Sequence, residues 1–91
     1  MKNLKDLEQL RREIDLLDKK LVEVIAKRMK VVKEVGRLKK SNNLKPLDKK
    51  RWRYVIKTRK QVAKKLKVNE SLIGGMFTLM HKYSLLEQKK V

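Results

Sequence analysis

Cysteine is absent from the 91 residues of this sequence, and histidine, proline and tryptophan each occur once. The absence of cysteine excludes disulfide bonds, a thiolate nucleophile and any metal site built on cysteine. The sequence has only one histidine, His81, and an ordinary zinc site needs more ligands of this kind. We therefore expect the chain to work with no metal and no cofactor.

Long apolar runs are also missing. The longest uncharged stretch, Ser71–Met80, is much shorter than the roughly 20 residues that are needed to span a bilayer. The first residues, Met1–Lys5, include two lysines and lack the apolar run of a secretory signal peptide. The sequence therefore predicts a cytoplasmic protein with no membrane partner.

Acidic residues are few. Ten Asp and Glu stand against 27 Lys and Arg, which gives a net charge of +17. A charge of this size predicts attraction to polyanions and to small anionic ligands. Nucleic-acid-binding proteins commonly have such a basic surface, so a basic helical dimer that binds nucleic acid is one hypothesis. The alternative is a lysine-rich solvated surface with no specific partner.

Residues 4–40 contain no proline and a single glycine, Gly36, and their apolar residues recur at alternating spacings of three and four. This period is typical of an amphipathic helix, so we predict one very long helix over this range. At one position where the repeat requires an apolar residue, the sequence has Arg28. The apolar seam of this helix consists of Leu7, Leu10, Ile14, Leu17, Leu21, Val24, Val31, Val35 and Leu38.

This helix is too long for a compact domain of such a short chain. It would span roughly 55 Å, whereas a compact domain of this size has a diameter of roughly 30 Å. An uncovered apolar seam is commonly buried against a second copy, so we expect an intertwined helical homodimer. The alternative is a helix that breaks near Gly36 and folds back as a monomeric bundle. A glycine inside a helix costs only about 1 kcal/mol and rarely breaks it alone.

The next segment, residues 41–48, is predicted to be a turn followed by an extended stretch, because Pro46 disfavours helix in the residue before it. Asp48 is a candidate N-cap for a second helix over residues 49–66.

Asn69 is a candidate N-cap for a third helix over residues 70–89. The sequence has no strand signal and no internal repeat. We therefore predict an all-α fold with three helices per chain, one very long and two shorter, in a single domain over residues 1–91.

Several cationic side chains lie on or near the seam of the first helix. Lys39 follows Arg28 by eleven residues, which turns it only about 20° around the helix and moves it about 16 Å along the axis, so both can reach a small anion between them. Arg11 precedes Arg28 by seventeen residues, about 25 Å, so these two arginines of one chain cannot hold the same small molecule. In an antiparallel dimer, Arg11 of one chain could approach Arg28 and Lys39 of the other.

The two shorter helices offer matching polar groups. Ser84 and Gln88 are four residues apart and share one face of the third helix, which His81 continues. Asp48 and Arg51 lie one turn apart at the start of the second helix. Together with the cations of the first helix, these groups predict a pocket for a small anion, since a buried charge needs a partner. In the alternative interpretation they have ordinary roles on packed or solvated surfaces.

With these residues the sequence resembles the all-helical chorismate mutases, the AroQ class, over essentially its whole length. The combination of four motifs in the family's order and spacing, rather than any single motif, carries the resemblance. The motifs are Leu10-Arg11-x-x-Ile14-Asp15-x-x-Asp18, Ala26-Lys27-Arg28 followed by Glu34-Val35-Gly36-x-x-Lys39, Pro46-x-Asp48-x-x-Arg51, and Ser84-x-x-x-Gln88.

The resemblance implies an enzyme that rearranges chorismate to prephenate, on the branch toward phenylalanine and tyrosine, with no covalent intermediate. It also implies a homodimer with two equivalent sites, each completed by Arg11 from the partner chain. Arg11 and Arg28 would bind the two carboxylates of the substrate with help from Ser84. Lys39 and Gln88 would hydrogen-bond the ether oxygen, so Lys39, Gln88 and Arg28 are the catalytic residues that the resemblance implies.

The resemblance also implies that Asp48 orients the ring hydroxyl of the substrate and that Arg51 supports the site. The chain departs from the family at Trp52, where many members have a glutamate that contacts this hydroxyl. Trp52 and His81 are therefore candidates to line the pocket, or Trp52 simply packs on its own helix. The missing acid leaves two alternatives open, an isochorismate-pyruvate lyase of the same fold and a catalytically inactive homologue.

Overall fold

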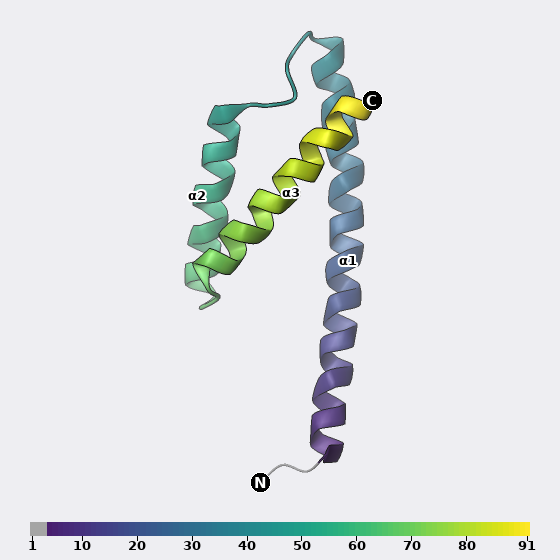
Figure 1. Cartoon of the computed structure of the whole chain (residues 1–91), viewed down its shortest axis with the longest axis vertical. Helices are drawn as coiled ribbons and strands as arrows, with labels where there is room; N and C mark the ends of the chain where they lie inside the picture. Colours follow the sequence, from purple (N-terminus) through teal and green to yellow (C-terminus); the bar gives the residue numbers. More distant parts are fainter. Residues whose placement is uncertain (1–3) are drawn as a thin grey trace. The chain divides into compact units, whose positions relative to one another are not determined.

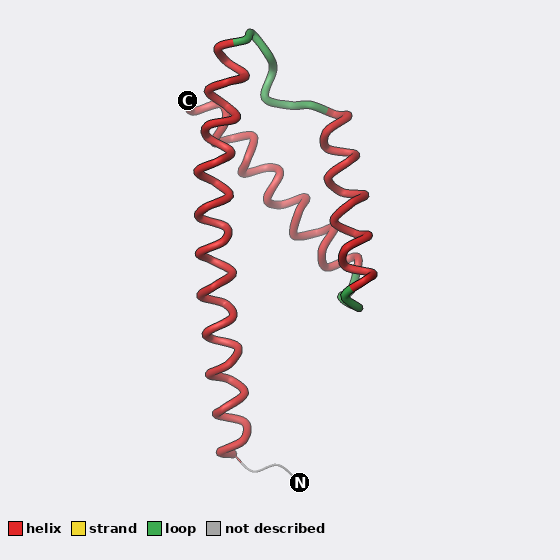
Figure 2. Tube along the Cα trace, turned by 180° about the vertical axis from the view of Figure 1, so that it is seen from behind, coloured by secondary structure: helices red, strands yellow, loops and turns green. Residues whose placement is uncertain are grey.

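The computed structural model describes residues 4–91, and every regular element in this range is a helix (Figures 1 and 2). Helix α1 runs over Leu4–Ser41, α2 over Lys49–Lys65 and α3 over Glu70–Lys90. These bounds agree within one residue with the predicted ranges, and the predicted all-α class with one long and two shorter helices is confirmed. Residues 1–3, at the start of the segment used above to predict the cellular location, lie outside the described residues.

Helix α1 continues without a break through Gly36. The alternative of a chain that folds back near this glycine is therefore wrong. Lys39 and Lys40 lie in the last turn, where cations favourably meet the negative end of the helix dipole.

Helix α1 ends in a Schellman motif built on a residue other than glycine. Asn43 adopts the left-handed conformation, with a φ of 58°, and the N–H of Leu44 donates to the carbonyl oxygen of Lys39 at 2.8 Å. Helix α2 ends in the same way at Lys67, whose φ is also 58°. The first of these motifs turns the chain sharply into the loop over residues 42–48.

The two predicted N-caps are confirmed. An Asp48 carboxylate oxygen accepts the backbone N–H of Arg51 at 2.9 Å, and the Asn69 side-chain oxygen accepts the backbone N–H of Leu72 at 3.0 Å. Each bond satisfies one of the backbone donors that the first turn of a helix leaves without an intrahelical partner.

The chain divides into two compact units, residues 1–31 and residues 32–91. In the described part of the first unit, the only element is the N-terminal portion of α1. All of its seam residues are exposed in the single chain, namely Leu7, Leu10, Ile14, Leu17, Leu21, Val24 and Val31. This unit therefore has no hydrophobic core of its own.

The second unit is organised by the pairing of α2 with α3. Val55 and Ala63 of α2 are buried, as are Gly74 and Ser84 of α3. Figure 1 shows α3 running from its start beside α2 to the C-terminal part of α1. Val55 and Ala63 carry the only two apolar side chains that are buried among the described residues, which is very little for a domain of this size.

In residues 4–91, no helix has a stretch both long enough and apolar enough to cross a lipid bilayer.

Candidate active site

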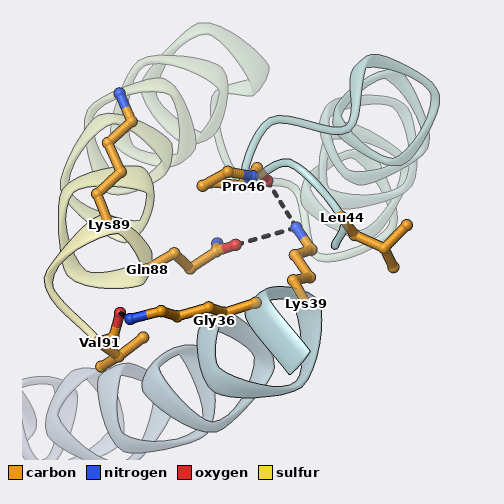
Figure 3. Close-up of a pocket in the computed structure, with 8 residues that line it drawn as sticks. Gly36, Lys39, Leu44, Pro46, Gln88, Lys89 and Val91 are labelled. Atoms are coloured by element: carbon orange, nitrogen blue, oxygen red, sulfur yellow. Dashed lines mark hydrogen bonds between the residues drawn. The ribbon is translucent and has the colours of Figure 1, made fainter. Parts of the chain in front are cut away.

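Lys39 lies in the last turn of α1 and Gln88 near the C-terminal end of α3, and in the second unit their side chains meet (Figure 3). The Lys39 ammonium donates to the side-chain oxygen of Gln88 at 3.0 Å and to the backbone oxygen of Pro46 at 2.6 Å. Because an ammonium group can only donate, the Gln88 amide is oriented with its oxygen toward the lysine and its NH₂ group away from it. These two bonds use two of the three ammonium protons. The pair can therefore offer N–H donors from both residues to one acceptor.

Pro46 reaches Lys39 because of the way α1 ends. The Schellman motif at Asn43 reverses the chain, and the side-chain amide of Asn42 donates to the Leu38 carbonyl at 2.8 Å. Both contacts hold the start of the loop against the last turn of α1. The loop then passes back over Lys39, so that a backbone carbonyl serves as its second acceptor.

A cavity of about 280 Å³ lies beside this pair. Three of its lining residues are lysines and none is acidic, so its potential is positive and suits a small anion. One of these lysines, Lys40, donates to the Val91 backbone oxygen at 3.3 Å. The lining residues are Gly36, Lys39, Lys40, Leu44, Pro46, Gln88, Lys89 and Val91.

Asp48 and Arg51 lie together at the start of α2, as their spacing predicts. Asp48 caps the helix through the Arg51 backbone N–H. The exposed Arg51 side chain lies with its guanidinium carbon 5.2 Å from the centre of the Tyr54 ring, a cation–π distance. In this structure both predicted site residues have local roles on α2.

Ser84 is buried, with 5% of its surface exposed, and lies one helical turn before Gln88. One turn further back on α3, His81 stacks on Trp52 of α2 with ring centres 4.1 Å apart and planes 15° apart. Both rings are half-buried. Trp52 therefore packs against another helix, and the stack joins the start of α2 to the middle of α3.

Arg11 and Arg28 lie on the part of α1 that belongs to the first unit. Arg11 is exposed, and its guanidinium pairs with the Glu8 carboxylate at 3.4 Å. An exposed pair of this kind contributes little stability. Arg28 is half-buried. The helical rise separates the two arginines by about 25 Å, so the single chain does not bring them together, as the sequence analysis expects.

Comparison with known proteins adds a direct observation to this geometry. Residues 10–89 match the family described as chorismate mutase type II. The chain belongs to this chorismate mutase family. The match covers every predicted site residue, from Arg11 to Gln88, and confirms the resemblance on which their assignment rests.

Two curated relatives are bifunctional chorismate mutase/prephenate dehydratases. The protein of Buchnera aphidicola subsp. Schizaphis graminum is 33% identical over 91 residues, the whole of this chain and 24% of the relative. The protein of Aquifex aeolicus is 30% identical over 84 residues, 88% of this chain and 21% of the relative. The chain thus spans less than a quarter of the length of these relatives.

The family motifs contain Lys39, Gln88, Gly36 and Pro46, but the sequence assigned no role to three features around the Lys39–Gln88 pair. These are the Pro46 carbonyl, the lysines Lys40 and Lys89, and the buried glycine Gly36. The carbonyl has no sequence signal, because every residue type has a backbone oxygen. The two lysines do not stand out either, because the chain is rich in lysine. Gly36 did have a signal, since it is the only glycine in a helix of 38 residues.

Proposed function

We propose that this chain catalyses the rearrangement of chorismate to prephenate, as a homodimer with two equivalent active sites. The observation that carries the proposal is the Lys39–Gln88 pair beside a cationic cavity, in a chain of the chorismate mutase family. Chorismate is a small dianion with an ether oxygen, and both features match what this cavity offers.

The reaction is an intramolecular rearrangement in which the carbon–oxygen bond of the ether breaks as a carbon–carbon bond forms. No proton is transferred and no covalent bond to the protein is made. Negative charge develops on the ether oxygen as its bond to carbon lengthens. The Lys39 ammonium and the Gln88 amide NH₂ donate to this oxygen. Such fixed donors lower the barrier because they are already oriented before negative charge develops on the oxygen.

Positioning of the substrate supplies the second part of the rate enhancement. Arg28 and Arg11 of the partner subunit bind the two carboxylates, with help from the buried Ser84 hydroxyl, and hold the flexible dianion in its reactive conformer. Asp48 orients the ring hydroxyl, and Arg51 supports the site. The stacked rings of Trp52 and His81 line the pocket between α2 and α3, and Trp52 stands where many family members have an acid.

The homodimer is supported by the exposed seam of α1. Leu17 is 63% exposed and Val24 is 60% exposed in the single chain. Burial of large apolar side chains stabilises an interface by about 1.5–3 kcal/mol each. An antiparallel second copy buries these residues, adds to the small core of the α2–α3 pair, and brings Arg11 of the partner subunit toward the site. The whole of residues 1–91 then acts as one domain in an intertwined dimer.

The first experiment mixes the purified chain with chorismate, follows the loss of substrate absorbance and identifies the product by mass spectrometry. We expect prephenate, and we expect Lys39→Ala to abolish most of the turnover. A parallel reaction with isochorismate is the control. Pyruvate release from isochorismate without turnover of chorismate would replace the proposal with the lyase, and turnover of neither substrate would indicate an inactive homologue.

A further inference from the structure

Gly36 lies where α1 packs directly against α3. It is buried, and a Cβ atom built on it would lie 2.8 Å from the Cα of Gln88 and 3.1 Å from its Cβ. The same Cβ would lie 2.8 Å from a methyl carbon of Val91. The Val91 methyl group can move aside, whereas the Gln88 Cα belongs to the α3 backbone. Any side chain at position 36 must therefore displace α3 itself.

The residue that α3 places against Gly36 is the same residue that bonds to Lys39. Lys39 lies three residues, or about one turn, beyond Gly36 on α1, and its ammonium reaches Gln88 at 3.0 Å. A backbone shift at Gln88 moves this side chain away from Lys39. The interatomic distance in the Lys39–Gln88 bond thus depends on the absence of a side chain at position 36.

We infer that Gly36 is a positioning residue, which sets the separation between α1 and α3 at which Lys39 and Gln88 act on the same oxygen. This inference rests on the proposed function for its effect on turnover. A merely structural role for Gly36 would change the stability of the chain and leave the turnover of its folded fraction unaltered.

The other two glycines provide matched controls. A Cβ on Gly74 would lie 2.7 Å from the Lys60 Cε, which is the far end of a flexible side chain that can move. A Cβ on Gly75 would meet nothing within 4 Å. All three glycines are helical, so alanine gains the same helix propensity at each of them. They differ in what the new methyl group touches.

The test compares Gly36→Ala with Gly75→Ala. Circular dichroism gives the folded fraction, and kcat and KM are measured per folded chain. We expect Gly36→Ala to lower kcat by roughly tenfold to a hundredfold, the range for misplacement of a catalytic group by about 1 Å, with a smaller change in KM. Gly75→Ala should match the wild type. An unaltered kcat in folded Gly36→Ala would overturn the inference.

A double-mutant cycle with Gln88→Ala tests whether Gly36 acts through Gln88. If it does, Gly36→Ala should lower kcat much less in the Gln88→Ala background than in the wild type, because neighbouring residues that act through one contact are not additive. If Gly36→Ala lowers kcat by the same factor in the Gln88→Ala background as in the wild type, the inference is overturned. If Gly36→Ala is unfolded in plain buffer, the same measurements are made in concentrated sucrose, which favours the compact state.

A third readout does not depend on activity. The side-chain amide NMR signal of Gln88 should shift in Gly36→Ala and stay in place in Gly75→Ala. An amide signal that does not move in Gly36→Ala would overturn the inference even if turnover is lost. A wild-type chain without turnover would instead count against the proposed function, while this signal still reports on the placement of Gln88.

Discussion

The two units of this chain differ in how their side chains find partners. In residues 32–91, helix packing within one chain already brings Lys39 to Gln88 and Trp52 to His81. In residues 6–31, the apolar seam stays exposed and Arg11 has only the neighbouring Glu8 as an ion-pair partner. The two residues proposed to donate to the reacting oxygen thus already meet within one chain. The two arginines proposed to bind the carboxylates, Arg11 and Arg28, lie on a segment whose apolar seam is exposed in the single chain.

We expect the largest loss of activity from removing the Lys39 ammonium, which Gln88 and Pro46 already hold in place within the second unit. Lys39→Ala leaves no ammonium beside Gln88, and removal of one such donor typically lowers kcat by roughly 10²–10³-fold. The measurement is kcat and KM from initial rates over a range of chorismate concentrations that reaches saturation. A rise in KM with kcat unaltered would mean that Lys39 contributes equally to substrate and transition-state binding.

The next prediction uses the first unit. Arg11→Ala alone should lose most activity, because Arg11 of the partner subunit is proposed to complete each site. When the Arg11→Ala and Lys39→Ala proteins are combined and exchange subunits, half of the dimers contain one chain of each kind. In such a heterodimer one site combines the intact Lys39 of the first chain with the intact Arg11 of the second, and the other site lacks both residues. Activity should therefore return to about a quarter of the wild-type value.

Each variant taken through the same exchange procedure alone is the control and should stay inactive. If the mixture remains as inactive as its components although mass spectrometry detects mixed dimers, the two residues do not belong to a shared site.

A smaller effect is expected from a test of whether the apolar seam of α1, rather than the rest of its surface, forms the dimer interface. Leu17 belongs to the seam and Leu16 does not, and both side chains are 63% exposed in the single chain. Leu17→Glu places a charge in the proposed interface and should shift the dimer to monomer, whereas Leu16→Glu should leave it intact. Sedimentation velocity at several protein concentrations measures the difference. Equal behaviour of the two variants would argue against the seam as the interface.

What the sequence predicted correctly about the fold was mostly local. The period of the seam placed α1, and Asp48 and Asn69 placed the starts of α2 and α3, because a cap bonds to the backbone only a few residues away. The resemblance to the family is confirmed by the match over residues 10–89. The homodimer, the single domain over residues 1–91 and the cytoplasmic location stay predictions.

The features that sequence reasoning missed are tertiary. The Pro46 carbonyl reaches Lys39 because Asn43 takes the left-handed conformation, and the turn predicted for this segment does not specify which backbone oxygen it brings to Lys39. The Trp52–His81 stack joins two helices, and helical period alone cannot pair residues on different helices. Gly36 stands out in the sequence as the single glycine of residues 4–40, although its contact with Gln88 could not be predicted from there.

The smallest effect concerns pH. The Gln88 amide does not titrate and is oriented by Lys39, so its NH₂ group donates at any pH near neutrality. We expect kcat to change less than about twofold between pH 6 and pH 8. In Gln88→Glu the side chain can donate only when protonated, and an ordinary glutamate has a pKa of about 4.3, so kcat should be low at pH 7 and rise as the pH falls. Parallel pH profiles of the two proteins measure this contrast. A steep loss between pH 6 and pH 8 in the wild type would mean that a titrating group, and not the amide, controls the reacting oxygen.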